Sequence, residues 1–331
     1  MKIGVVGAGS WGTTLAHLLA GSGHEVRIWA REPEVVEAIN RTHENSLFLP
    51  GAPLAASLLA YSELEPVVSG AELIVSAAPS HAVRAVSRQM KRWLRGSPIV
   101  VSVSKGLEPG SLETMTAVLQ EELGELPVVA LSGPSFAQEV YQKQPTAVVA
   151  ASADWSAAET VQRAFSNGYF RVYTSADVLG VQLGGALKNV IAIAAGILEG
   201  MGLGNNPRAA LITRGLAEMT RLGEAMGADP ATFAGLAGMG DLILTATGAL
   251  SRNRSLGVEI GKGRKLEEVL RERRTVAEGV NTARAAVELA SRVGVELPIA
   301  AQVEQVLFQG KEPRRAIADL MERELKAERW R

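Results

Sequence analysis

Near the start of the chain lies Gly7-Ala8-Gly9-Ser10-Trp11-Gly12, a GxGxxG motif. The apolar segment Lys2–Val6 before it predicts a β-strand, and the period of Trp11–Ala20 predicts a helix after it. In this context the three glycines allow a tight turn, close approach of the backbone to a pyrophosphate, and close packing of helix on strand. The N–H groups that open the helix would face the phosphates. The motif predicts dinucleotide binding; the alternative is a glycine-rich turn without a ligand.

Strands and helices alternate through the first half of the chain. Helical patterns occur at Glu32–Ile39, Ala82–Leu94 and Thr114–Leu123. This alternation predicts a mainly parallel, doubly wound sheet with helices on both faces. Beyond the first strand, apolar and β-branched segments predict strands at Glu25–Ala30, Leu73–Ala77, Ile99–Val103, Val128–Leu131, Ala147–Ala150 and Tyr169–Tyr173.

The sequence changes character near Ala176. No strand pattern follows it, and apolar residues recur at helical spacing, as in Ala209–Met226, Val280–Val293 and Ile299–Phe308. A chain of 331 residues suits two domains. We therefore predict an α/β, Rossmann-like, doubly wound domain over residues 1–176 and an all-α, substrate-binding domain over residues 177–331.

The composition excludes several kinds of site. The chain has no cysteine, hence no disulfide and no thiolate metal site, and its four histidines all lie in the first quarter. We expect no metal. A net charge of −1 argues against nucleic acid as the main partner. The sequence starts directly on a strand pattern, without the pattern of a signal peptide. We expect a soluble protein of a reducing compartment, the cytoplasm.

One long apolar segment, Val178–Leu198, carries a single charge, that of Lys188. A lysine at the centre of a membrane span costs about 2.5–3.5 kcal/mol, so we predict a buried helix and no stable membrane insertion. Helical side chains lean toward the N-terminus, so Lys188 should lie over Gly184 and Gly185, which would leave open space around the amine. Burial lowers a lysine pKa and suits proton transfer. The alternative is a lysine that reaches the surface.

Other polar side chains stand where a ligand crevice is expected. Lys105 and the segment Ser132-Gly133-Pro134-Ser135-Phe136-Ala137 follow predicted strands, and the carboxyl ends of parallel strands line the crevice. Asp241, preceded by Gly238-Met239-Gly240, would hold Lys188 charged and oriented, unless it caps a helix. Ser251-Arg252-Asn253-Arg254 offers donors for a phosphate, unless it is solvated surface.

The end of the second predicted strand bears on the choice of cofactor. A site that prefers NAD commonly has Asp or Glu there, which binds the ribose 2′-OH. The chain reads Trp29-Ala30-Arg31-Glu32, so Ala30 takes the acidic position and Arg31 can face a 2′-phosphate. We predict NADP over NAD. Glu32 keeps NAD open, because a register different by one residue would place it at the acidic position.

Together these motifs resemble those of the bacterial-type NAD(P)-dependent glycerol-3-phosphate dehydrogenase family. The resemblance covers most of the chain, and the motifs stand in the order of the family. One motif alone is weak, whereas the ordered set is specific. After the GxGxxG motif it comprises Pro79-Ser80-His81, Ser104-Lys105-Gly106, Gly133-Pro134-Ser135-Phe136-Ala137, Leu187-Lys188-Asn189, Gly238-Met239-Gly240-Asp241, Ser251-Arg252-Asn253-Arg254 and Val276-Ala277-Glu278-Gly279.

The resemblance implies a set of site residues. It implies Lys188 as the general acid and base, with Asp241 beside it. The residues that it places around glycerol 3-phosphate are Lys105, Gly133, Ser135, Asp241, Ser251, Arg252 and Asn253. Those that it places around the nicotinamide cofactor, with Gly7, Gly9 and Gly12, are Ser10, Trp11, Arg31, Phe48, Lys105, Ala137, Arg252, Val276 and Glu278. Phe48 stands where the family often has Tyr.

The implied reaction is reversible hydride transfer between NAD(P)H and dihydroxyacetone phosphate, a phosphorylated small molecule, to give sn-glycerol 3-phosphate for phospholipid synthesis. Lys188 would protonate the carbonyl oxygen, and Arg252 would anchor the phosphate. We also expect a homodimer. Two alternatives stay open: a related two-domain dehydrogenase of 3-hydroxy acids or ketopantoate, and a non-catalytic NADP-sensing protein. The triplet at 251–253 argues against the first, and Lys188 with Asp241 argues against the second.

Overall fold

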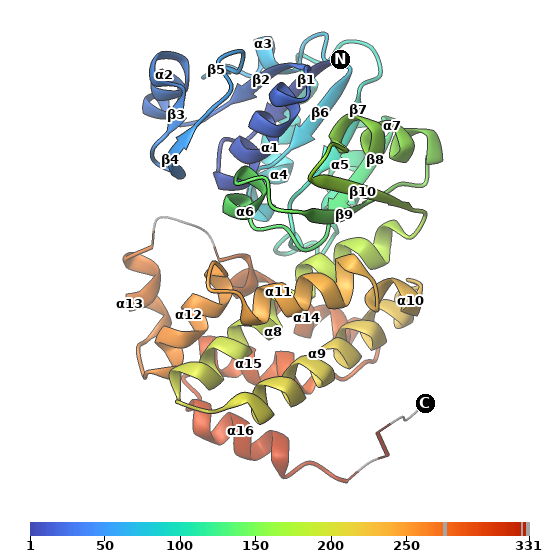
Figure 1. The fold of residues 1–331 in the computed structure, drawn as a ribbon. Coiled ribbons are helices and arrows are strands. Elements are labelled where there is room, and N and C mark those ends of the chain that lie inside the picture. Colours follow the sequence, from blue (N-terminus) through green and yellow to red (C-terminus); the bar gives the residue numbers. More distant parts are fainter. Residues whose placement is uncertain (274–276, 326, 329–331) are drawn as a thin grey trace.

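A layered sheet and a cluster of helices make up the two parts of the molecule (Figure 1). A computed structural model describes residues 1–273, 277–325 and 327–328. The strands all precede Ala176, as predicted for the described chain. They are β1 (Lys2–Val6), β2 (Glu25–Trp29), β3 (Glu44–Asn45), β4 (Leu49–Pro53), β5 (Leu59–Tyr61), β6 (Leu73–Ser76), β7 (Ile99–Ser102), β8 (Val128–Ser132), β9 (Thr146–Ala151) and β10 (Phe170–Ser175).

The main sheet has eight strands in the order β10-β9-β8-β7-β6-β1-β2-β5. Neighbouring strands are parallel except β8 and β9, which pair antiparallel with Ala130 opposite Ala151. The predicted mainly parallel sheet is therefore confirmed. The short strands β3, β4 and β5 were not predicted, because β4 reads Leu-Pro-Gly-Ala-Pro, which has the composition of a turn.

Both faces of the sheet are covered, which makes its strands nearly continuous apolar segments. Val5 and Val75 belong to the core on one face, whereas Val6 and Ile74 belong to the core on the other. The covering helices are α1 (Ser10–Gly21), α2 (Pro33–Thr42), α3 (Glu65–Val68), α4 (Val83–Lys91), α5 (Met115–Leu123), α6 (Ala137–Tyr141) and α7 (Trp155–Phe165), and Ser80–Ala82 form a 3₁₀ turn.

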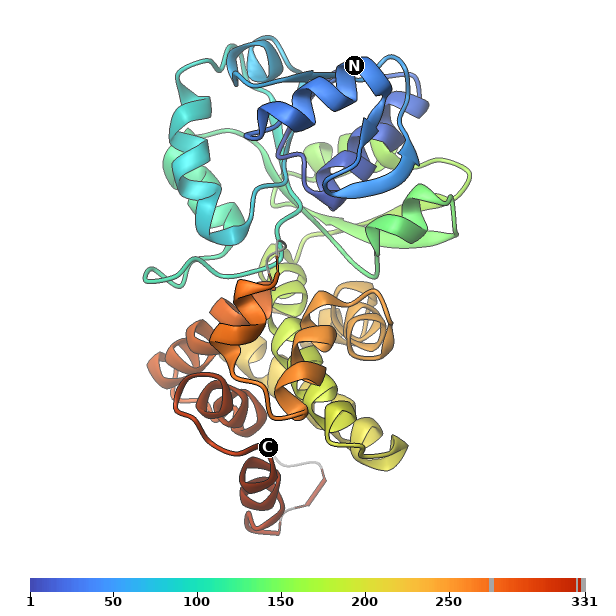
Figure 2. The same cartoon turned by 90° about the vertical axis from the view of Figure 1, so that its left-hand side faces the viewer.

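The second part is built around α8 (Val178–Gly200), which runs through its middle in both views (Figures 1 and 2). This helix is long and apolar enough to cross a membrane, but 94% of its most apolar stretch is buried inside the protein. The helices around it are α9 (Asn205–Ala225), α10 (Pro230–Phe233), α11 (Asp241–Thr247), α12 (Arg252–Gly261), α13 (Leu266–Arg271), α14 (Glu278–Arg292), α15 (Pro298–Phe308) and α16 (Pro313–Met321), with a π-helical turn at Leu236–Gly240.

The loops at the carboxyl ends of the central strands face the helical part. Lys105, after β7, reaches Asp241 at the start of α11, and Ser80, after β6, reaches Glu278 at the start of α14. The carboxyl edge of the sheet and the N-terminal ends of two helices therefore meet at one place, where residues from both parts of the chain come together.

Candidate active site

The loop after β1 has the shape that a dinucleotide needs. Gly7 has a φ of +121°, and a Cβ added there would lie 2.8 Å from the backbone of Ala77. A Cβ on Gly12 would lie 1.9 Å from the carbonyl oxygen of Gly7. A Cβ on Gly9, in contrast, would meet no described atom within 4 Å. The turn and the start of α1 thus require glycine, and free space lies over Gly9, where a pyrophosphate would approach the helix N-terminus.

Several other expected cofactor residues surround this loop. The hydroxyl of Ser10 donates to the carbonyl of Phe48 at 2.6 Å, and Thr14 Oγ1 donates to the carbonyl of Ala137 at 3.2 Å. Arg31 lies just beyond β2, with its side chain 82% exposed and 2.9 Å from Glu32 Oε1. Val276 lies outside the described residues.

Lys188 and Asp241 form the centre of the second cluster. Lys188 Nζ donates to Asp241 Oδ1 at 2.6 Å and to Thr245 Oγ1 at 2.7 Å. Lys105 Nζ donates to the other carboxylate oxygen, Asp241 Oδ2, at 2.7 Å. Lys188 is 5% exposed and Asp241 1% exposed. One buried carboxylate therefore separates two ammonium groups, one from each part of the molecule.

The surroundings change the pKa values of this cluster. Burial lowers the pKa of Lys188 to about 7; the charges of Lys105 and Arg252 act in the same direction, and Asp241 acts against them. Burial alone would raise the pKa of Asp241, but Lys105 and Lys188 hold it below its usual value. Asp241 is thus ionised at neutral pH, and Lys188 is poised to gain or lose a proton there.

Hydrogen bonds fix the position of Lys105. Its Nζ donates to the carbonyl of Gly133 at 2.8 Å and lies 3.5 Å from Ser135 Oγ. The amide of Asn189 donates to the carbonyl of Lys105 at 3.1 Å, and the amide of Asn253 donates to Asn189 Oδ1 at 2.9 Å. This chain of contacts joins the loops after β7 and β8 to α8 and α12.

The start of α12 contributes the expected phosphate-binding triplet. Ser251 is buried, and its hydroxyl accepts from the backbone N–H of Arg254, which caps the helix. Asn253 Oδ1 accepts from the backbone N–H of Gly279 at 3.0 Å. Arg252 is accessible to solvent, yet surrounding protein lowers the pKa of its guanidinium, while the charge of Glu278 acts in the opposite direction. Because Arg252 is exposed and its charge acts on Lys188, it is a cation close to the site.

Comparison with known proteins identifies this arrangement. Residues 2–158 match the family described as NAD-dependent glycerol-3-phosphate dehydrogenase N-terminus, and residues 177–318 match its C-terminus. The chain belongs to the NAD-dependent glycerol-3-phosphate dehydrogenase family. The predicted resemblance is confirmed, and so is the fold class, a Rossmann-like domain followed by a helical one.

Relatives of known name cover the whole chain. It is 58% identical to the glycerol-3-phosphate dehydrogenase [NAD(P)+] of Geobacter metallireducens and 52% identical to that of Myxococcus xanthus, over 99% of each chain. A crystal structure of glycerol-3-phosphate dehydrogenase from Coxiella burnetii has a TM-score of 0.93 at 39% identity, with 97% of this chain and 98% of that one covered. A ketopantoate reductase from Ralstonia eutropha shares the fold at 19% identity and a TM-score of 0.61.

In this member of the family, one expectation about Lys188 is wrong. The space beside Gly184 and Gly185 is not open. A Cβ on Gly184 would lie 2.5 Å from the carbonyl oxygen of Ala237, and a Cβ on Gly185 would lie 2.6 Å from Ser132 Oγ. The two glycines let neighbouring segments approach the backbone of α8, and this approach buries Lys188.

Three polar residues of this candidate site received no role from the sequence. Thr245 contacts Lys188, and its signal was a spacing of four from Asp241 in a helical pattern. Asn189 holds the backbone of Lys105. Ser80 donates to the carboxylate of Glu278 through its N–H at 3.0 Å and through its hydroxyl at 2.5 Å. Ser80 and Asn189 lie in family motifs, but only the fold shows their partners.

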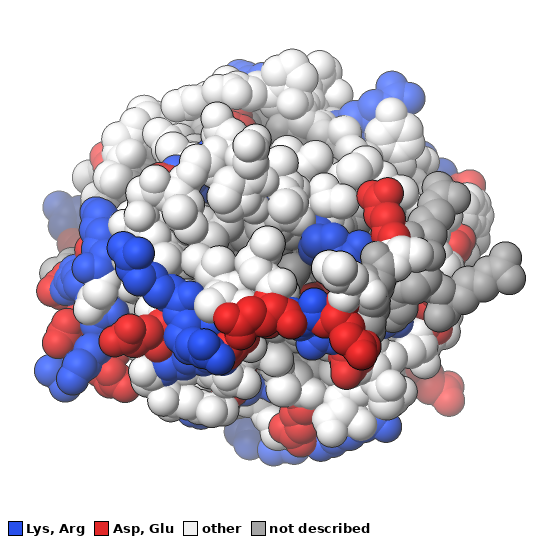
Figure 3. Space-filling view, turned by 90° about the horizontal axis from the view of Figure 1, so that it is seen from below, with Lys and Arg blue, Asp and Glu red and all other residues white. Residues whose placement is uncertain are grey.

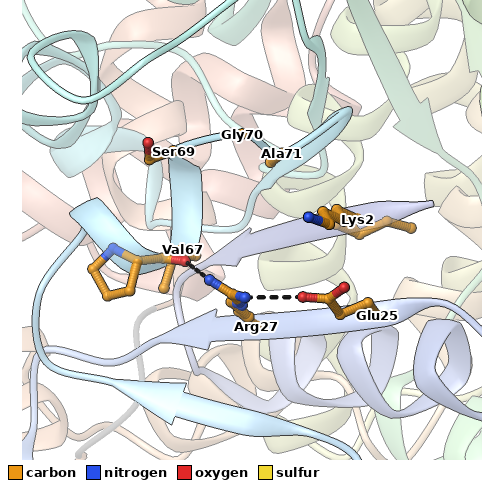
Figure 4. A pocket seen from close by; sticks show the side chains of 9 residues that line it. Lys2, Glu25, Arg27, Val67, Ser69, Gly70 and Ala71 are labelled. Atoms are coloured by element: carbon orange, nitrogen blue, oxygen red, sulfur yellow. Dashed lines mark hydrogen bonds and ion pairs between the residues drawn. The ribbon is translucent and has the colours of Figure 1, made fainter.

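Away from this candidate site, the described residues form an open pocket of about 950 Å³ between the ends of α8, α12 and α15. They contain no group of three His, Asp or Glu side chains that could hold a metal ion. A cavity of about 60 Å³ lies at the amino ends of β1 and β2 (Figure 4). There Arg27 already binds Glu25 at 2.9 Å and the carbonyl of Pro66 at 2.9 Å (Figure 4). These charges satisfy one another.

Proposed function

We propose that the chain reduces dihydroxyacetone phosphate to sn-glycerol 3-phosphate with NAD(P)H, and oxidises it in reverse. Its family confirms the predicted class, an NAD(P)-dependent oxidoreductase that acts on a CH–OH group. One observation carries the mechanism: Lys188, buried and with a pKa lowered to about 7, is held by Asp241 where the cofactor loops meet the helical part. The product would supply phospholipid synthesis.

The nicotinamide dinucleotide would lie along the start of α1. The open space over Gly9 and the free N–H groups of Ser10 and Trp11 fit a pyrophosphate there. When bound, the reduced cofactor supplies the hydride. Arg31 lies where a 2′-phosphate would extend from β2, which supports a preference for NADP, although Glu32 competes for its guanidinium.

Lys188 would act on the oxygen of the carbonyl. As carbon 2 accepts the hydride, negative charge grows on that oxygen, and the ammonium of Lys188 stabilises the charge and gives up one proton to it. The neutral amine takes a proton from the hydroxyl in the reverse reaction. Asp241 stays ionised, so it orients Lys188 and is not itself the proton donor. No metal is required, because the ammonium supplies the positive charge.

Cations from both parts would bind the rest of the substrate. Arg252 is an exposed cation at the start of α12, with Ser251 before it and Asn253 after it, and suits the phosphate. Lys105 and Ser135, on the loops after β7 and β8, would face the hydroxyl groups. We accordingly assign residues 1–176 to a cofactor domain and residues 177–331 to a substrate domain.

We also propose that the chain is a homodimer of the cytoplasm. Exposed apolar side chains occur at Leu203, before α9, and at Met239, Ile243 and Leu250, around α11. Figure 3 shows a wide area without charged side chains beside a band of mixed charge. Burial of an exposed apolar face against a second copy across a two-fold axis would stabilise a dimer. Sedimentation should give twice the chain mass, and Ile243→Glu should shift it to one chain mass; a monomeric wild type would refute the dimer.

A direct assay tests the function. NADPH oxidation should follow addition of dihydroxyacetone phosphate, and sn-glycerol 3-phosphate should accumulate in equal amount. Ketopantoate and 3-keto acids should give no oxidation above background. Turnover of ketopantoate would favour the related dehydrogenase, and NADPH binding without turnover of any ketone would favour the sensing protein.

A further inference from the structure

Asn45 is a buried amide that touches the dinucleotide loop from outside the GxGxxG motif. It ends β3, and it is 0% exposed. Its Nδ2 donates to the carbonyl of Ala8 at 2.8 Å and to Thr13 Oγ1 at 2.8 Å. Thr13 Oγ1 in turn donates to the same carbonyl at 3.1 Å. Two side chains therefore hold one peptide group of the loop.

That peptide group sets which atoms of the loop face the ligand. A buried carbonyl needs a donor, and in this loop the carbonyl of Ala8 is bound by Asn45 and Thr13. A trans peptide places its N–H opposite to its carbonyl, so this oxygen, fixed against β3, fixes the N–H of Gly9 on the other side of the peptide, beside the open space. Without the amide, only the longer hydrogen bond from Thr13 would hold the carbonyl, and rotation of the oxygen toward that space, where it would repel a pyrophosphate, would become easier.

The other end of the same amide fixes the opposite wall of the site. Asn45 Oδ1 accepts from the backbone N–H of Phe48 at 3.1 Å, and the carbonyl of Phe48 accepts from Ser10 Oγ at 2.6 Å. Asn45 uses both of its polar ends, so its rotamer is determined. One side chain thus joins residues 45–48 and the glycine loop into one rigid unit.

We propose that Asn45 is a positioning residue for the dinucleotide, which holds the phosphate-binding loop in its binding shape before the cofactor arrives. The proposal rests on the proposed function in that NAD(P) is taken as the ligand. Preorganisation of this kind raises affinity, since less ordering is left to occur on binding. Asn45 touches no expected reacting atom, so its loss should act on cofactor binding and leave the chemical step nearly unchanged.

The test compares Asn45→Ala with a matched control, Asn40→Ala. Asn40 also spans two segments of the same domain, because its amide donates to the carbonyl of Ala60 at 2.9 Å and accepts from its N–H at 2.8 Å. We expect Asn45→Ala to raise the Kd for NADPH and NADH, measured without substrate, at least about tenfold. Asn40→Ala should stay within about twofold. The KM for the cofactor should rise in parallel, with kcat within about threefold.

A second variant tests the same contact if Asn45→Ala fails to fold. Thr13→Val keeps the volume and removes the hydroxyl between Asn45 and Ala8, so it should raise both Kd values about threefold in a folded protein. Equal losses in the Asn40 and Asn45 variants, or unchanged Kd values in both Asn45→Ala and Thr13→Val, would overturn the positioning role. A wild type that binds NADPH but does not reduce dihydroxyacetone phosphate would refute only the proposed function, because every readout for Asn45 can be taken as binding.

Discussion

Lys188 Nζ lies 2.6 Å from Asp241 Oδ1, across 53 residues of sequence and between two helices, α8 and α11. Removal of either partner would leave an uncompensated charge in a buried place. The carboxylate is shared with Lys105, so the group carries one positive charge when both lysines are protonated. Loss of one proton from Lys188 leaves the three side chains with no net charge, and in the proposed mechanism this proton passes to the substrate.

The pH dependence should have opposite signs in the two directions. Ketone reduction needs the ammonium form of Lys188, so its kcat/KM should fall as pH rises through about 7. Oxidation of glycerol 3-phosphate needs the neutral amine, so its kcat/KM should rise over the same range. Parallel pH profiles in the two directions would exclude Lys188 as the titrating group.

Lys188→Ala should lose at least about 10²–10⁴-fold in kcat in both directions and keep its cofactor Kd. The control is Lys91→Ala, which changes an exposed lysine of α4.

Asp241→Asn should move that pH profile. Asp241 is the charge that raises the pKa of Lys188 against burial, so its removal lowers this pKa below about 7. The midpoint for ketone reduction should shift to lower pH, and activity at pH 7 should fall steeply. A variant that loses kcat with an unshifted midpoint would show that Asp241 acts on geometry alone.

Much of this site could be predicted from the sequence, because short local patterns carry it. The GxGxxG turn and the lone charge of Lys188 in an apolar segment are patterns that constrain the chain by themselves. The contacts between Ser80 and Glu278, 198 residues apart, are not local. The packing at Gly184 is not local either, because a glycine pattern is as consistent with a close neighbouring segment as with open space. β5 was missed because three residues at a sheet edge carry too little periodicity.

Arg31→Ala should test the preference for NADP. The side chain is exposed and paired with Glu32 on the surface, so the change should disturb the fold little. The KM for NADPH should rise about tenfold while that for NADH stays within about twofold, because only the 2′-phosphate is lost as a partner. Ala30→Asp is unsuitable as a test, because Ala30 is buried and the substitution would place a carboxylate in the core. An unchanged ratio of the two kcat/KM values would place the 2′-position elsewhere.

Glu218 of α9 should make stability depend on pH. It is buried, and it accepts from the N–H groups of Ile299 and Ala300 at the start of α15. Burial raises its pKa from 4.5 to about 7. The folded state therefore holds the proton more tightly, so the free energy of unfolding should fall as pH rises from about 4.5 and be lowest above about 7, by up to about 3 kcal/mol.

Glu218→Gln removes this titration. The free energy of unfolding of the variant, relative to that of wild type, should therefore increase from pH 5 to pH 8. Denaturant unfolding at both pH values measures this. Glu224→Gln, an exposed position of the same helix, should show no such change. A difference between wild type and Glu218→Gln that is the same at both pH values would assign the titration to another group.

Arg252→Ala should weaken the phosphorylated ketone specifically. Net charge is only −1, so attraction of a dianion has to be local. A hydrogen bond to a charged group contributes about 1.5–3 kcal/mol, which corresponds to roughly a tenfold to hundredfold loss in kcat/KM for dihydroxyacetone phosphate. Dihydroxyacetone has no phosphate, so its poor turnover should fall far less. Both ketones are measured at one ionic strength, because salt screens an accessible cation.

The matched control for that comparison lies two residues further along α12. Arg254 binds Glu199 of α8 at 2.6 Å and is not among the ligand contacts that the family resemblance implies. Arg254→Ala should therefore change kcat/KM for the two ketones by the same factor, through the fold alone. If Arg252→Ala also lowers kcat/KM for both ketones by the same factor, the KM for NADPH separates two explanations. A raised KM for NADPH would place Arg252 against the dinucleotide, toward Glu278, whereas an unchanged KM would give it a purely structural role. Only a loss confined to the phosphorylated ketone assigns the guanidinium to the phosphate.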